Sequence, residues 1–210
     1  MTILALEFSS VRRSVALAKG GVVLAEAVDS TGGRGTGAFA LIGQVLAGAN
    51  TPREAVEVIA VGLGPGSYTG IRAAIAVAQG WQLARGTSLL GVSSVESLAA
   101  QAQAEKIFGR VNLVIDAQRG EFYLAQWEIT GTLRQEMVPL KIVPAADLSA
   151  RQSAGEICAG PELERLLFPS AATVAALAAG RADFLAGEKL EPVYLRPPAF
   201  VKAPAARLAA

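Results

Sequence analysis

The sequence predicts an α/β protein that consists of two related subdomains. Apolar runs with the period of strands alternate with helical patterns along the 210 residues, as they do in α/β domains. In addition, a unit made of a strand, an acidic residue, a turn and two further strands occurs twice, which indicates an internal duplication. We expect an N-terminal subdomain at residues 1–104 and a smaller, truncated C-terminal one at residues 105–210.

The first unit opens the chain as a three-stranded antiparallel meander. Its strands are expected at residues 3–9, 14–18 and 22–28, and the first of them contains Glu7 near its end. A helix is expected next, over residues 36–48. Because residues 36–50 contain no charged side chain, this helix is apolar nearly all round, which is typical of a helix inside a core or against another chain.

A glycine-rich turn from Gly64 to Arg72 is the point around which the first half is organised. It joins a strand at residues 58–62 to the next helix, which Ser67 or Thr69 can cap. A glycine-rich turn before a helix can bind phosphate, but this spacing fits neither the P-loop nor the dinucleotide-binding motif. We therefore prefer a packing turn, with phosphate binding as the weaker alternative. The small residues along the helix permit close approach of another helix.

The second unit repeats the first from residue 111 onward. Aligning Glu7 with Asp116 also aligns Val15 with Leu124 without a gap. The remaining elements are expected as strands at residues 89–93, 111–116, 121–127, 135–143 and 156–160, and as helices at 94–104, 145–151, 161–167 and 170–179. Two such halves that face each other across a cleft describe an actin-like fold, the duplicated ribonuclease H-like architecture of the ASKHA class.

The composition excludes several classes of enzyme and favours a location in the cytoplasm. The chain has no histidine and one cysteine, Cys158, so a Ser-His-Asp or Cys-His site and a histidine-based metal site are excluded, and with them a metallopeptidase. A net charge of +1 gives no strong electrostatic footprint for nucleic acid. No apolar run reaches the length of a membrane span and the N-terminus has no signal-peptide pattern, so we expect a cytoplasmic protein.

Several segments give the chain a resemblance to the bacterial TsaB (YeaZ) family. The segments are residues 6–9, the glycine-rich stretch 60–72, residues 91–94 and 115–121, and the closing Glu191-Pro-Val-Tyr-Leu-Arg196. The resemblance implies a non-catalytic scaffold subunit of the machinery that adds threonylcarbamoyl to N6 of an adenosine in tRNA. It further implies binding to the catalytic paralogue TsaD and the ATPase TsaE, a homodimer when alone, tRNA bound only through the complex, and no cofactor or metal.

The resemblance also implies that the first two helices form a bundle with the equivalent helices of the partner. This agrees with the apolar and small-residue faces of those helices. The residues expected to provide the core and partner faces of this two-helix platform are Phe39, Ile42, Val45, Leu46, Ile71, Ala74, Ile75 and Ala78. The sequence does not divide them between core and interface.

An alternative function is an actin-like ATP-binding phosphotransferase or ATPase. In that case Glu7 and Asp116, one from each half, would help hold a magnesium nucleotide across the cleft. The segment from Glu7 to Arg13 contains no glycine, however, and a phosphate needs close approach to the backbone. The competing interpretation is that both acidic residues stabilise hairpins.

Overall fold

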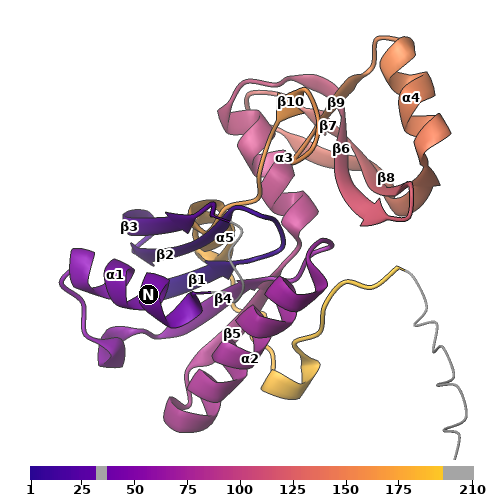
Figure 1. Ribbon diagram of the computed structural model, residues 1–210. Helices are drawn as coiled ribbons and strands as arrows, with labels where there is room; N and C mark the ends of the chain where they lie inside the picture. The colour runs from indigo at the N-terminus through magenta and orange to yellow at the C-terminus, as the bar shows by residue number, and fades with distance from the viewer. Residues whose placement is uncertain (32–36, 196–210) are drawn as a thin grey trace, which may run out of the picture.

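The first lobe is built around a five-stranded mixed sheet (Figure 1). The computed structural model describes residues 1–31 and 37–195. The strands of this sheet are β1 (Thr2–Glu7), β2 (Arg13–Lys19), β3 (Val22–Asp29), β4 (Val58–Gly62) and β5 (Ser88–Val92). Their spatial order is β3-β2-β1-β4-β5, with an antiparallel meander at one side and β4 and β5 parallel to β1. The meander and the central strands confirm the expected elements.

The second lobe repeats this topology. Its strands are β6 (Gly109–Gln118), β7 (Glu121–Ile129), β8 (Arg134–Pro144), β9 (Ile157–Gly160) and β10 (Arg165–Leu166). Their order, β10-β9-β6-β7-β8, is that of the first sheet once β6 is matched with β1. The structure therefore has the predicted duplicated, two-lobed, actin-like α/β fold.

The two units align in sequence without a gap, but the pairing of their first two strands differs by one residue. Glu7 pairs with Ser14 in the first sheet, and the equivalent partner of Asp116 would be Tyr123. Asp116 instead pairs with Phe122, because the register of β6 and β7 shifts between Asp116 and Gln118. Such an irregularity displaces the pairing by one residue without changing the length of the sequence.

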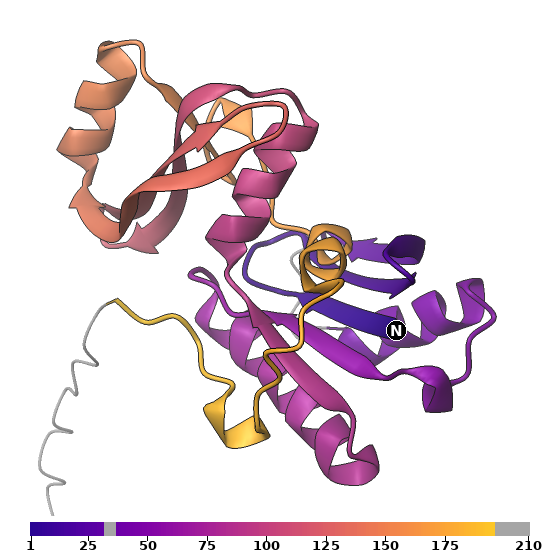
Figure 2. The same ribbon diagram turned by 180° about the vertical axis from the view of Figure 1, so that it is seen from behind.

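Helices cover both faces of each sheet. In the first lobe, α1 (Ala38–Gly48) and α2 (Tyr68–Arg85) lie on one face and α5 (Ala171–Ala178) lies on the other (Figures 1 and 2). In the second lobe, α3 (Ser94–Ala104) and α4 (Ala145–Ser153) lie on opposite faces. Two short 3₁₀ helices, η1 (Arg53–Ala55) and η2 (Gly187–Lys189), complete the elements. The described part of α1 agrees with the predicted helix, and residue 36 lies outside the described residues.

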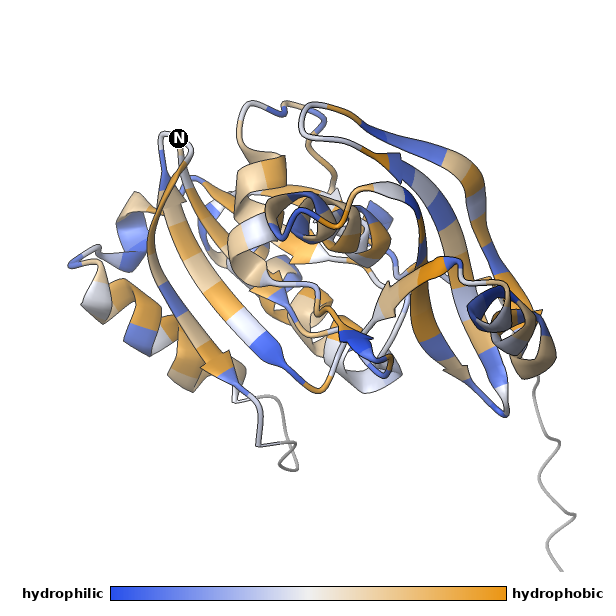
Figure 3. Cartoon of the chain, turned by 90° about the horizontal axis from the view of Figure 1, so that it is seen from above, coloured by the Kyte–Doolittle hydropathy of each residue, from blue (hydrophilic) through white to orange (hydrophobic). Residues whose placement is uncertain are grey.

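Alternation along the strands explains this arrangement. Leu4 and Leu6 of β1 point toward α1 and α2, whereas Ile3 and Ala5 point toward α5, because successive side chains of a strand point to opposite faces. All six residues of β1 are buried. The central strands are accordingly apolar along most of their length (Figure 3). No helix in residues 1–31 and 37–195 is both long and apolar enough to cross a membrane.

Two helices pack on the sheet formed by the other half of the sequence, so the lobes do not divide at residue 104. The apolar side chains of α3, among them Leu98, are buried against the second sheet. Those of α5, among them Val174, are buried against the first sheet. By packing, α3 belongs to the second lobe, while α5 and the following residues to Val193 belong to the first. Sequence order cannot reveal this exchange, since each helix has an apolar face that fits either sheet.

The helix predicted at residues 161–167 is wrong. These residues form turns and the short strand β10, which pairs in parallel with β9. Leu163 and Leu167 have the spacing of one helix face, but Leu163 packs in the α4 core and Leu167 in the α3 core, on opposite sides of the sheet. The second lobe therefore lacks a counterpart of α2, which confirms that it is truncated.

Candidate partner interface and interdomain cleft

The predicted platform residues belong almost entirely to the core of the first lobe. Seven of the eight are buried against the first sheet, namely Ile42, Val45, Leu46, Ile71, Ala74, Ile75 and Ala78. Only Phe39 is exposed, with 76% of its surface accessible. These seven side chains hold α1 and α2 in place, so they are not surface residues through which a partner would make its first contact.

The solvent-facing sides of the same two helices, which we call the outer helix face, carry mostly uncharged side chains, and the exposed Arg72 borders this face one helical turn from Ala76. The outer helix face comprises Phe39, Ala40, Gly43, Gln44 and Ala47 of α1 and Thr69, Ala76, Gly80, Leu83 and Ala84 of α2, all of them exposed. Leu83 is 88% accessible. Exposed apolar surface of this kind is typical of protein interaction sites, and small residues let another helix approach closely.

A hollow indents this face at the C-terminal end of α1. Its volume is about 410 Å³, and Gly43, Ala47, Asn50 and Pro52 are among the residues that line it. The sequence signal for the outer helix face was the absence of charge over residues 36–50. The periodicity of the apolar residues selected the buried side of each helix instead, because the apolar residues at helical spacing are those that pack on the sheet.

The glycine-rich turn before α2 packs against protein backbone. The Ser67 amide donates a hydrogen bond to the Ser9 carbonyl at 2.7 Å, and the Ser67 hydroxyl accepts one from the Gly70 amide at 3.3 Å. A Cβ atom at Gly66 would lie 2.1 Å from the Ser9 carbonyl oxygen, and one at Gly70 would lie 2.0 Å from that of Phe8. Gly66 and Gly70 therefore leave room for the backbone of Phe8 and Ser9, which follows β1. This agrees with the prediction of a packing turn and with Ser67 as the N-cap of α2.

Glu7 lies at the junction of three segments and is fully buried. One carboxylate oxygen accepts a hydrogen bond from the Ser9 amide at 2.7 Å, and the other accepts one from the Ser94 hydroxyl at 2.9 Å. Ser94 begins α3, and its hydroxyl also accepts a hydrogen bond from the Gly64 amide. Gly62 leaves the necessary space, since a Cβ there would lie 1.9 Å from a Glu7 oxygen. Glu7 therefore connects β1, the glycine-rich turn and the first residue of α3.

Burial raises the pKa of the Glu7 carboxyl, although its hydrogen bonds from Ser9 and Ser94 oppose that shift. The folded protein consequently holds this proton more tightly than the unfolded chain does. The stability that the protonated carboxyl contributes is complete below the ordinary glutamate value of 4.5. It is lost as the pH rises through the higher pKa of the folded state.

We expect Glu7→Gln to gain stability relative to the wild type as the pH rises from about 4 to 8. The gain is at most about 1.4 kcal/mol per pH unit, the effect of a single proton. Urea unfolding at each pH measures it, and Glu136→Gln, which removes an exposed carboxylate, is the matched control. A difference between Glu7→Gln and wild type that does not change with pH would contradict this assignment.

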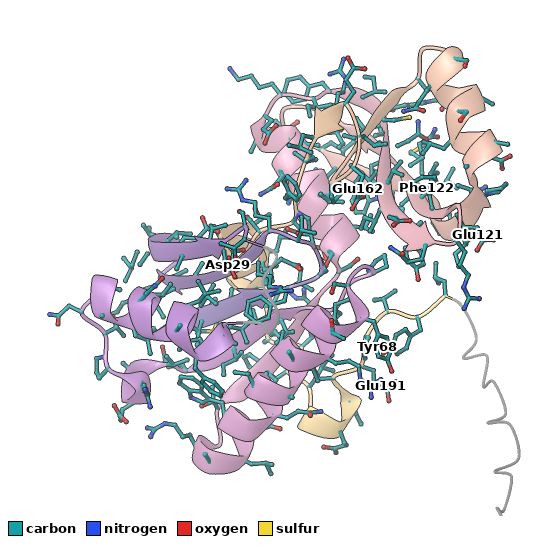
Figure 4. The ribbon with its side chains drawn as sticks, in the orientation of Figure 1. Asp29, Tyr68, Glu121, Phe122, Glu162 and Glu191 are labelled. Atoms are coloured by element: carbon teal, nitrogen blue, oxygen red, sulfur yellow. The ribbon has the colours of Figure 1, made fainter. Side chains whose placement is uncertain are left out.

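A cleft of about 690 Å³ lies between the two lobes. Ser9, Arg13, Tyr68 and Tyr194 line it from the first lobe, and Asp116, Gln118, Arg119, Tyr123 and Glu162 line it from the second. The pKa of Glu162 is raised by burial and by the negative charge of Asp116. Figure 4 shows Tyr68 on the first lobe and Glu162 on the second. In the described residues no three Asp, Glu or Cys side chains gather as metal ligands would.

The structure does not bring Glu7 and Asp116 together in this cleft. Asp116 is part of the cleft wall, and its carboxylate accepts a hydrogen bond from the Gln118 amide at 2.8 Å. Glu7 does not line the cleft and is fully buried. Each carboxylate binds the backbone two residues after it, which is the arrangement expected if both stabilise their hairpins.

Topology and site together define the class of this protein: a duplicated actin-like protein with a largely uncharged helix face on its first lobe. The chain matches the family model described as TsaD, tRNA N6-adenosine threonylcarbamoyltransferase, over residues 37–190. It belongs to this family and, within it, to the TsaB (YeaZ) group.

Individual relatives agree with this assignment. The tRNA threonylcarbamoyladenosine biosynthesis protein TsaB of Escherichia coli (strain K12) is 34% identical over 88 residues, 42% of this chain and 38% of that protein. The protein of the same description from Bacillus subtilis (strain 168) is 29% identical over 148 residues, 70% of this chain and 64% of that protein. The chain thus matches less than two thirds of the length of each of these relatives.

Solved structures match over a larger share of the chain. YeaZ from Pseudomonas aeruginosa superposes with a TM-score of 0.76 at 28% identity, covering 92% of this chain and 99% of that one. A protein described as uncharacterized, with similarity to peptidase YEAZ from Pseudomonas aeruginosa, superposes with a TM-score of 0.79 at 28% identity, covering 93% and 99%.

Proposed function

We propose that this chain is a non-catalytic scaffold subunit of the tRNA N6-threonylcarbamoyladenosine transferase complex. In this role it binds the catalytic TsaD subunit through the outer helix face of α1 and α2. The observation that carries the proposal is that face itself, where two neighbouring helices expose Phe39 and Leu83 among small uncharged residues. The names of the TsaB relatives support a role in the biosynthesis of threonylcarbamoyladenosine in tRNA.

The same surface accounts for the homodimer that we propose, and the further partners join the assembled pair. Without TsaD, a second copy of the chain covers the face and forms a homodimer. The ATPase TsaE joins the pair of TsaB and TsaD, and tRNA is engaged when the complex has assembled, in the cytoplasm. The scaffold role is supported by the use of Glu7, since the buried carboxylate binds Ser9 and Ser94 and so joins the lobes.

Size-exclusion chromatography with light scattering tests this proposal. The full-length chain is run alone and then mixed with TsaD from the same cell. We expect a homodimer alone and a new complex with one copy of each protein in the mixture. A chain that stays monomeric and ignores TsaD would overturn the scaffold function. Calorimetry with ATP and Mg²⁺ would then test the ATPase alternative, for which binding should be lost in Asp116→Ala.

A further inference from the structure

Tyr68, Arg72 and Tyr194 form a cluster at the edge of the cleft that the scaffold function does not use. The Arg72 Nη1 atom donates hydrogen bonds to the hydroxyl of Tyr68 at 2.7 Å and to that of Tyr194 at 3.3 Å. The guanidinium carbon also lies 4.9 Å from the centre of the Tyr68 ring. The two rings are inclined by 34° with their centres 6.0 Å apart. We call these three side chains the tyrosine–arginine cluster.

The fold positions this cluster at the border of the outer helix face, because Arg72 is one helical turn from Ala76 of that face. Tyr68 and Arg72 are one helical turn apart, on the side where α2 meets the chain after η2. On that side, the side-chain amide of Gln79 donates a hydrogen bond to the Gly187 carbonyl at 2.7 Å. The amide of Val193 donates to the Leu63 carbonyl at 2.9 Å, and Tyr194 follows directly. The cluster is thus assembled from segments 122 residues apart.

Although it is held in place, the cluster stays open to solvent. Tyr68 is 58% accessible and Tyr194 is 50% accessible. Among residues 1–31 and 37–195, no carboxylate forms an ion pair with Arg72. Its two tyrosine bonds both use Nη1, so Nε and Nη2 can donate to a ligand. An oriented guanidinium beside accessible aromatic rings suits an anionic ligand that also has a flat ring.

The charges around the cleft favour a ligand at its edge over one in its depth. Arg13 and Arg119 also line the cleft, and Arg119, on the turn between β6 and β7, forms no ion pair among the described residues. Asp116 and Glu162 line the same cleft, and these two carboxylates repel phosphate from the space beside them. At the edge, by contrast, Arg72 forms no ion pair with a carboxylate among the described residues and stands beside the two rings.

We infer that the tyrosine–arginine cluster binds a nucleotide of a single-stranded RNA segment, with a base on a tyrosine ring and a phosphate on Arg72. Aromatic side chains stack on unpaired bases of any sequence, and a neighbouring cation holds the backbone. This inference rests on the proposed function and extends it: within the complex, this chain itself contacts the RNA. The small net charge of the chain explains why such a contact needs the assembled complex for affinity.

Fluorescence anisotropy with a labelled, single-stranded oligoribonucleotide tests the inference on the reconstituted complex with TsaD at low salt. Tyr68→Leu, which removes the stacking ring, is expected to weaken RNA binding about five- to hundred-fold, the range for loss of one stacked base. Tyr68→Phe keeps the ring and should restore affinity to within about twofold of wild type.

Arg72→Gln probes the phosphate contact separately. It is expected to weaken binding and to reduce the slope of log affinity against log salt by about 0.7, the value for one phosphate of a single strand. Arg134→Gln is the matched control, because it removes an exposed arginine of the second lobe and should leave the affinity unchanged. Circular dichroism checks that each variant is folded.

Three results would overturn the inference. RNA affinity could be the same in Tyr68→Leu and Arg72→Gln as in wild type. Adenosine monophosphate could compete as strongly, mole for mole, as the oligoribonucleotide, which would assign the cluster to free nucleotides. Tyr68→Leu could release TsaD instead of RNA, which would make the cluster a protein contact. Failure of the wild-type chain to bind TsaD in chromatography is a separate result, and it would remove the proposed function itself.

Discussion

Leu83→Glu is expected to prevent the chain from binding TsaD while its own fold stays intact. Leu83 is 88% accessible, so the new carboxylate is fully hydrated in the free protein. In a complex across the outer helix face it would be desolvated among uncharged residues. Because loss of a hot-spot residue costs about 2 kcal/mol or more, and a buried unpaired carboxylate adds to that loss, we expect binding at least roughly thirty-fold weaker.

Chromatography with light scattering measures the complex, and thermal circular dichroism measures the fold. Met137→Glu is the matched control, because Met137 is also exposed, at 47%, but lies on β8 of the second lobe. Ile42→Glu provides the opposite comparison, since Ile42 is buried in the first core and its replacement should unfold the protein. If Leu83→Glu binds TsaD as tightly as Met137→Glu does, the outer helix face is not the interface.

Gly70→Ala is expected to destabilise the protein by about 3 kcal/mol or more, which is large for the addition of one methyl group. The new Cβ would lie 2.0 Å from the Phe8 carbonyl oxygen, and that oxygen belongs to backbone that cannot rotate away. The connection after β1 and the start of α2 would have to separate. The hydrogen bond from the Ser67 amide to Ser9 would be strained at the same time.

Gly80→Ala on the same helix is the matched control, with an expected effect of opposite sign. A Cβ at Gly80 meets no atom within 4 Å, so the substitution only removes backbone freedom from the unfolded chain. We expect a gain of roughly 0.5 to 1 kcal/mol. Urea unfolding of both variants measures the pair. Equal stabilities of Gly70→Ala and Gly80→Ala would show that the turn relaxes without cost.

Local sequence patterns predicted individual strands, helices and helix caps most accurately. The apolar run that ends in Asp116 predicts β6, and Ser67 and Gly86 at the two ends of the helical pattern predict α2 and its caps. Gly86, for example, ends α2 in the left-handed conformation with φ of 70°. These signals are reliable because each depends on residues within a few positions of one another.

The prediction failed where two competing structures fit the same local pattern. The spacing of Leu163 and Leu167 fits a helix, but pairing of β10 with β9 places them on opposite sides of the sheet. Similarly, the apolar stripe of α1 predicts one buried side, and the sequence cannot tell whether a sheet or a partner buries it. The structure shows that the sheet covers Ile42 and leaves Phe39 exposed.

By itself, the sequence determined the strands, most helices, the duplication and the TsaB group of this protein. These depend on short-range periodicity, on turn residues such as Gly64, and on a motif that is continuous in the chain. The tertiary structure alone decided which sides of α1 and α2 face solvent, which lobe α3 and α5 join, and that Tyr194 meets Arg72. Each of these depends on contacts between segments distant in sequence, and such contacts exist only after the sheets have formed and the helices have packed on them.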